Sequence, residues 1–224
     1  MGGYLIYLAL ILIIPIWAQM RVKGAYNKYS KVPVSSGMTG AQVARKILDD
    51  KGLYDVQIEE VQGVLSDHYD PRKKVVRLST DNYHGHSMAA AAVAAHEVGH
   101  AIQDAEEYGF LKFRTALVPL ASFGSNSAFF IILAGLFLGW MDLLLLGIIF
   151  MSFAVLFQLV TLPVEFNASS RAMDQLVMTG IIQNVEERDT KKVLDAAALT
   201  YVAAALVAVA ELVRFILIFL ANRE

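Results

Sequence analysis

The sequence predicts a mainly α-helical protein with four membrane spans and a small α+β part on the cytoplasmic side. Of its 224 residues, 56% are hydrophobic and only 18% are charged, and this apolar share exceeds that of ordinary soluble domains. The excess lies in a few long apolar runs, which is typical of membrane segments. Basic residues gather between particular runs, and this bias orients the spans.

The apolar runs define the expected spans. The first covers residues 4–20; basic residues follow it and none precedes it, so we expect an uncleaved anchor and not a signal peptide. Residues 117–138 and 141–162 should form a hairpin joined by the short sequence GWMD. The last span is expected at residues 199–220. Pro163 is expected to break the third span.

Two polar segments, residues 21–116 and 163–195, separate these spans. In the first, Thr39 and Gln42 fit a capping box that opens a helix. The sequences DVQIEEV and KKVVRLS alternate as strands do, and SDHYDPR between them is rich in turn residues. An alanine-rich helix is expected to follow from Ser87 to about residue 104. These patterns predict the small α+β part.

Charge orients the segments. Of the 19 Lys and Arg residues, 13 lie between Arg21 and Arg114, and four more lie within residues 163–195. The GWMD connection has none, so the positive-inside rule places both polar segments in the cytoplasm and both termini outside. We therefore expect a multi-pass protein of the cell membrane, in contact with the lipid bilayer. A net charge of −2 gives no reason to expect nucleic acid as a partner.

The last apolar run carries two charged residues, Glu211 and Arg214. Side chains three residues apart on a helix can pair, so a structural ion pair is the simpler expectation. Charged residues at that depth can also serve a transporter, which leaves transport open as a rival function.

The motif that carries chemistry is His96-Glu97-Val98-Gly99-His100. Residues four apart share a helix face, so His96 and His100 can bind one metal ion. Glu97 is then placed to act as a general base towards a water molecule. The chain contains no cysteine, so any metal must be held by His, Asp or Glu. Zinc, at one ion per chain, suits this donor chemistry.

The alternative is an alanine-rich helix that happens to hold two histidines. Against it, the alanines at residues 89–95 let the helix backbone approach its neighbours closely. Gly99 inside the motif costs about 1 kcal/mol relative to alanine, which indicates close packing or space for a substrate. A plausible third ligand is also present. We therefore favour the metal site.

The third ligand follows by elimination. The metzincin motif would need Gly and His where Gln103 and Glu106 stand, and the aspartate motif of site-2-type intramembrane proteases is absent from the sequence. On a continuing helix, Glu106 and Glu107 would move away from the ion. Glu165, directly after the third span, emerges on the same side as the motif helix. It is the expected third ligand.

These residues resemble known families. HEVGH, a two-helix hairpin and then EFNASSRA are similar to the HtpX-like and CAAX-prenyl membrane metalloproteases, in which the glutamate opening the second segment is the third zinc ligand. The resemblance carries that role to Glu165 and implies a zincin-like part of the Glu-zincin type. This chain departs at Ser169, where those families have an aspartate that is expected to support a histidine ligand.

A closer resemblance covers most of the chain. DHYDPR, RLS, YHGHSMAAAAVAAHEVGHAIQDA and EFNASSRA are similar to the membrane-bound neutral zinc metallopeptidases of the YugP-like group. The resemblance implies a zinc endopeptidase that acts on peptide bonds of membrane or membrane-associated proteins. The alternative is a non-catalytic zinc-binding membrane scaffold or chaperone. Other protein partners are unknown.

Several further side chains are candidates for supporting roles. The KKVVRLS strand could align an extended substrate by edge pairing. A surface or capping role is expected for His68, His84 and His86. Tyr69 and Arg171 are candidates for contacts to the transition state.

Overall fold

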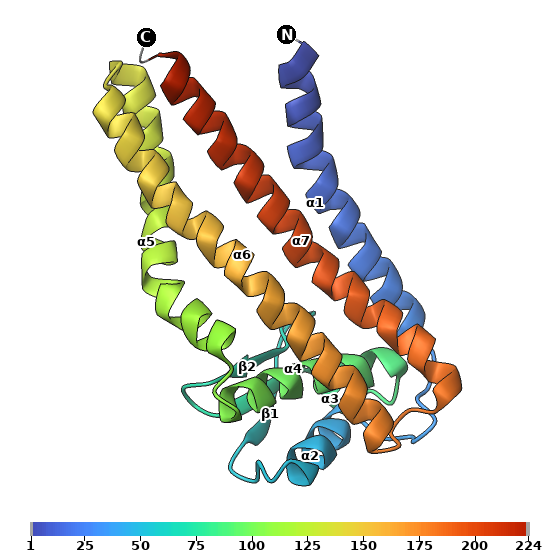
Figure 1. The fold of residues 1–224 in the computed structure, drawn as a ribbon. Coiled ribbons are helices and arrows are strands. Elements are labelled where there is room, and N and C mark those ends of the chain that lie inside the picture. The colour runs from blue at the N-terminus through green and yellow to red at the C-terminus, as the bar shows by residue number, and fades with distance from the viewer. Residues whose placement is uncertain (1, 223–224) are drawn as a thin grey trace. The chain divides into compact units, whose positions relative to one another are not determined.

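The computed structural model describes residues 2–222 and is mainly helical (Figure 1). Within these residues, four helices are long and apolar enough to cross a membrane, judged by length and composition. They are α1 (Gly2–Tyr29), α5 (Gly109–Leu138), α6 (Met141–Met178) and α7 (Asn184–Ala221). The mainly helical class and the four candidate spans are therefore confirmed.

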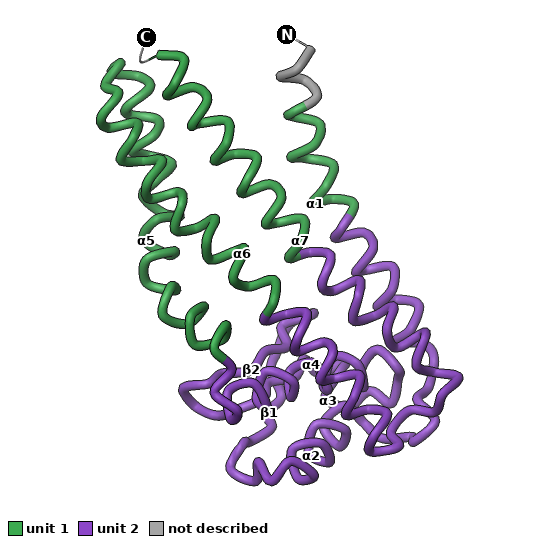
Figure 2. The backbone as a smooth tube through the Cα atoms, viewed as in Figure 1, with its two compact units in different colours: residues 1–17, 109–163, 201–224 green, residues 18–108, 164–200 purple. Residues whose placement is uncertain are grey.

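The chain divides into two compact units, which Figure 2 shows in separate colours. Unit 1 comprises residues 1–17, 109–163 and 201–224, and unit 2 comprises residues 18–108 and 164–200. The division falls inside α1, α6 and α7, so each of these helices contributes to both units. The motif helix and Glu165 belong to unit 2.

Unit 1 holds the apolar hairpin and the charged pair of the last span. A buried cluster joins α5 and α6 through Ala128, Ile132, Leu144 and Ile148. In α7, Arg214 donates to Glu211 Oε2 at 2.8 Å, which confirms the expected pairing. The Tyr7 hydroxyl of α1 also donates to the Glu211 carboxylate.

Unit 2 contains the α+β part that the strand and cap patterns predicted. Its remaining elements are α2 (Gly40–Asp50), β1 (Gln57–Val61), β2 (His68–Asp70), β3 (Val75–Ser79), α3 (Thr80–His84) and α4 (Met88–Ala105). The capping box before α2 is confirmed, because Thr39 and Gln42 bond reciprocally. The strand order is β1-β3-β2, with β1 parallel and β2 antiparallel to β3. β2 lies where only a turn was expected.

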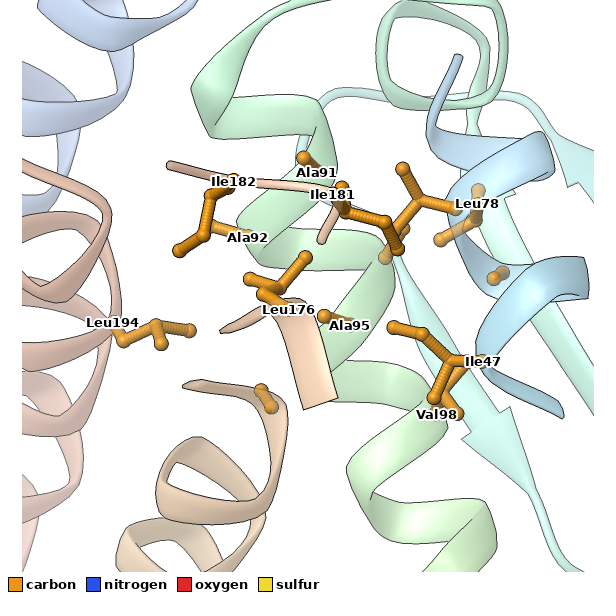
Figure 3. Packing of buried hydrophobic residues seen from close by; sticks show 14 of the residues in the cluster. Ile47, Leu78, Ala91, Ala92, Ala95, Val98, Leu176, Ile181, Ile182 and Leu194 are labelled. Carbon is orange, nitrogen blue, oxygen red and sulfur yellow. The ribbon is translucent and has the colours of Figure 1, made fainter. Parts of the chain in front are cut away.

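The core of unit 2 forms around α4. Its alanines are buried, and Figure 3 shows Ala91, Ala92 and Ala95 among larger side chains from α2, β3 and the ends of α6 and α7. Ile47, Leu78 and Leu176 are fully buried in this cluster. A methyl side chain occupies little space, so neighbouring elements pack close to the α4 backbone. This agrees with the interpretation of the alanine run.

The expected break at Pro163 is wrong. Helix α6 continues through Pro163 to Met178. Proline removes one backbone donor, but helices in membrane proteins tolerate it when neighbouring groups satisfy the carbonyl it leaves free. Glu165 therefore lies within a helix, where Ser169 follows it four residues later on the same face.

Candidate metal centre

Three potential ligands converge in unit 2. Helix α4 carries His96 and His100 one turn apart, and α6 carries Glu165. His96 Nε2 lies 3.2 Å from Glu165 Oε2, and His100 Nε2 lies 3.6 Å from the same oxygen. The three donor atoms are within 4.8 Å of one another. The structure thus brings together the residues that the sequence proposed.

The spacing of these donors fits a zinc ion. Zinc bonds of about 2.0–2.1 Å in a tetrahedron put neighbouring donor atoms roughly 3.3–3.4 Å apart. The two distances to the Glu165 oxygen, 3.2 and 3.6 Å, bracket that value. Among the described residues, no further His or carboxylate joins the group. Three protein ligands are the set found in catalytic zinc sites, which leave one position for water or substrate.

The tautomer of His100 is fixed by a chain of hydrogen bonds. The Val164 carbonyl can only accept, so the Gln103 nitrogen that lies 2.8 Å from it must be the donor end of the amide. The Gln103 oxygen, 3.0 Å from His100 Nδ1, can therefore only accept a proton from that nitrogen. A neutral His100 protonated at Nδ1 keeps a lone pair on Nε2, the atom that faces Glu165.

His96 has a simpler partner. Its Nδ1 lies 3.2 Å from the Ser169 hydroxyl, while its Nε2 faces Glu165. Ser169 stands where the resemblance to the HtpX-like metalloproteases would lead one to expect an aspartate. The Ser169 hydroxyl can hydrogen-bond the imidazole, but it supplies no negative charge.

The hydrogen bonds around Gln103 continue outward along α6. The Asn167 side-chain oxygen accepts from Gln103 at 2.9 Å and from Arg171 Nε at 2.7 Å. Arg171 also donates to Glu106 at 2.6 Å. Gln103 is fully buried, whereas the Glu106 side chain is 53% exposed. The network therefore connects the buried site to the surface of unit 2.

Gly99 explains how α4 and α6 come close enough for their potential ligands to converge. A Cβ atom at Gly99 would lie 2.5 Å from the Ala168 carbonyl oxygen, a distance that real Cβ atoms essentially never show. Because that obstacle is backbone, a side chain could be accommodated only if one helix moved. Of the two roles considered for Gly99, the structure supports close packing.

Glu97 lies beside the ligands without being one of them. Burial raises the pKa of its carboxyl to about 7, while the adjacent His96 and a hydrogen bond from the Tyr69 backbone N–H act in the opposite direction. Glu97 is 8% exposed. The Tyr69 backbone belongs to β2, so this strand lies next to the motif helix.

The other candidate residues have partners away from the three ligands. The Tyr69 hydroxyl donates to Asp104 at 2.9 Å, and Arg171 belongs to the network around Gln103. His68 contacts Ser66 and Arg77. His84 contacts Glu60, and His86 contacts Gly37. The suggestion that β3 aligns a substrate by edge pairing is wrong, because β1 and β2 occupy both of its edges.

Sequence reasoning missed the supporting residues Gln103 and Asn167. Gln103 had been considered only as a mismatch to the metzincin motif. Its position three residues after His100 on the same helix was a usable signal, because such side chains are neighbours. Asn167 gave no comparable signal, since its contact with Gln103 joins two helices that are far apart in the sequence.

Fold and site together give a chain with four candidate membrane spans among its described residues and a cluster of two histidines and one glutamate that could hold a metal ion. The chain belongs to the family described as "Putative neutral zinc metallopeptidase", whose model matches residues 4–220. It is 57% identical over 208 residues to the "Putative membrane protease YugP" of Bacillus subtilis, covering 93% of this chain and 92% of that protein. No solved structure gives a significant match. The family resemblance found in the sequence is confirmed.

Proposed function

We propose that this chain is a zinc-dependent membrane endopeptidase that cleaves membrane or membrane-associated proteins at the cytoplasmic face. His96, His100 and Glu165 hold one zinc ion, and Glu97 is the general base. The observation that carries this proposal is the convergence of three donors at distances of 3.2 and 3.6 Å, with Glu97 beside them. Membership of a zinc metallopeptidase family supports it.

When bound, zinc supplies a Lewis acid that polarises the peptide carbonyl and acidifies water. Glu97 takes a proton from the attacking water as the new carbon–oxygen bond forms. It then delivers that proton to the departing nitrogen as the carbon–nitrogen bond breaks, so that one water molecule is consumed for each bond cleaved. Meanwhile the Nδ1 contacts to Gln103 and Ser169 hold the two imidazoles in place.

Strand β2 is the better candidate for aligning a substrate. It is an edge strand of the sheet, and the backbone N–H of its Tyr69 reaches Glu97. An extended peptide beside this edge would pass the general base. Backbone pairing of this kind gives affinity with little sequence preference, which suits a protease that accepts varied segments.

The test separates metal binding from turnover at Glu97. Glu97→Gln keeps the size of the side chain and removes the base, so it should retain near-stoichiometric zinc while peptide cleavage falls by about 10² or more. Zinc content by elemental analysis and cleavage of a reporter peptide measure the two effects. Glu107→Gln, in the turn just after the same helix, is the matched control and should lose neither.

Two results would contradict this proposal. Full proteolysis by a clean Glu97→Gln preparation would assign the base to another residue. A wild-type protein that binds zinc but shows no chelator-sensitive peptide cleavage would favour the non-catalytic zinc-binding scaffold.

The cytoplasmic placement has a separate test. The 13 basic residues between Arg21 and Arg114 predict that this segment stays inside and the N-terminus lies outside. Reporter tags at the N-terminus and after Asp50 should therefore report opposite sides of the membrane. Two tags on the same side would remove the orientation argument and leave the metal site unaffected.

A further inference from the structure

Helices α1 and α7 enclose a groove in unit 2 that the proposed peptidase chemistry does not use. Its volume is about 510 Å³. From α1 it is lined by Met20, Arg21, Gly24, Ala25, Lys28 and Tyr29, and from α7 by Lys192, Asp195, Ala196 and Leu199. Both helices are candidate membrane spans.

The groove lies where the sequence of both helices changes from apolar to charged. The apolar run of α1 ends at Met20, and that of α7 begins at Leu199. Charged residues of the groove follow the first run and precede the second. A bilayer has its headgroup region at such a transition, because the apolar runs occupy the hydrocarbon core. The groove is thus expected at headgroup depth.

The lining has the chemistry of a site for an anionic amphiphile. Three cations, Arg21, Lys28 and Lys192, line the groove together with apolar side chains and one carboxylate, Asp195, which is paired with Lys191. Lys192 donates to Asp189 at 2.6 Å, and Asp189 also accepts from the Tyr29 hydroxyl, so the ammonium group is held in position. An ammonium group has three donors, which leaves Lys192 able to bond an additional anion.

Gly24 keeps the groove open. A Cβ atom at this position would meet no atom within 4 Å. Close helix packing therefore does not require the glycine, unlike Gly99. A larger side chain at Gly24 would project into open space, which offers a way to fill the groove without changing its charge.

We propose that this groove binds an anionic phospholipid, with the phosphate between the basic residues and the glyceride portion against the apolar ones. Basic pockets between membrane helices on the cytoplasmic side bind such headgroups, and the cytoplasmic leaflet carries the anionic lipids. The excess of cations matches a phosphate diester. The apolar lining matches the attached glyceride, which free phosphate lacks.

The test uses the full-length protein in detergent micelles supplied with phosphatidylglycerol or phosphatidylcholine, with retained lipid counted by native mass spectrometry. Wild type should retain phosphatidylglycerol over phosphatidylcholine by about tenfold or more. Gly24→Leu should abolish that preference, and Lys28→Gln should lower it by about fivefold. The matched controls are Gly109→Leu, which also adds a side chain in open space, and Lys46→Gln; both should keep the wild-type preference.

Three outcomes would overturn the lipid site. Equal retention of both lipids by wild type would show unselective surrounding lipid. An unchanged preference in folded Gly24→Leu and in Lys28→Gln would place the binding elsewhere. Displacement of the lipid by equimolar glycerol phosphate would identify a site for a soluble phosphate ester. Lys28→Gln changes an exposed side chain, so it keeps the test valid if Gly24→Leu fails to fold.

Discussion

Two long helices each carry a glutamate that is partly or fully removed from water, and the surroundings of the two differ. Glu165 in α6 is 3% exposed and faces two imidazoles. Glu211 in α7 is bonded by the Arg214 guanidinium at 2.8 Å and by the Tyr7 hydroxyl. Arg214 itself lies over the Phe215 ring.

The difference concerns how each negative charge is balanced. A guanidinium is always protonated and cannot bind a metal, so it neutralises Glu211 permanently. Neutral imidazoles instead offer lone pairs, and together with a carboxylate they form a site that a divalent cation completes. The surroundings of Glu211 suit a structural role, and they reduce the case for the transporter alternative. Those of Glu165 suit metal binding.

The largest difference in zinc binding is expected between the variants Glu165→Ala and Glu211→Ala. Glu165→Ala removes the proposed third ligand, so zinc affinity should fall by more than the roughly 100-fold that loss of a supporting contact can cost, and proteolysis should be lost with it. Glu211→Ala should retain zinc while lowering the thermal stability, because Arg214 loses its carboxylate partner. Elemental analysis and thermal unfolding of both purified variants measure these effects.

Full zinc occupancy in Glu165→Ala would contradict the assignment and end the comparison. The same conclusion would follow from zinc loss in Glu211→Ala, because the two carboxylates would then not differ in role.

A smaller effect is expected when the ligands remain but the support of His100 is removed. Gln103→Met keeps the side-chain volume and deletes the oxygen that accepts from Nδ1, so zinc affinity should fall by about 10–100-fold. Chelator competition measures the affinity, and ¹⁵N chemical shifts of the His100 ring report the change of tautomer. Gln175→Met, a buried glutamine of α6 outside the network, is the matched control.

Unchanged affinity and unchanged ring shifts in Gln103→Met would show that the amide only fills space. A similar loss in Gln175→Met would attribute the effect to general loosening of unit 2.

The smallest effect is expected at the outer end of the network. Glu106→Ala removes an exposed pair with Arg171, and such pairs contribute about 1 kcal/mol or less. Zinc occupancy should stay nearly intact, as it should for Glu107→Ala. Strong zinc loss in either variant would mean that the third ligand lies beyond His100 on the same chain segment and would overturn the role of Glu165.

The fold was predictable from sequence where the signals are local. Run length revealed the candidate spans, and the spacing of Thr39 and Gln42 revealed a cap, because each of these features depends on one continuous stretch of sequence. The continuation of α6 through Pro163 was not predictable, since neighbouring groups decide whether a proline ends a helix. Strand β2 was missed because three residues within a turn-rich stretch show no alternation.

The candidate site divides in the same way. His96 and His100 can be read from their spacing on one helix. Glu165 could be proposed only by elimination and resemblance, because its nearness to the histidines is created by packing. The Gly99–Ala168 approach that makes this packing possible leaves no local pattern beyond an unexplained glycine. The burial of the Glu97 side chain also could not be predicted, because it depends on the tertiary packing around α4.

The division of the ligands between α4 and α6 also has a consequence for biosynthesis. Glu165 is 165 − 100 = 65 residues beyond His100, so a nascent chain carries both histidines well before it carries the third ligand. At about 5–20 residues per second, translation of that interval takes roughly 3–13 s. By then α5 and the apolar part of α6 before Glu165 have been made. An unfinished chain therefore cannot assemble the complete donor set, and the order of synthesis would itself delay the proposed peptidase activity.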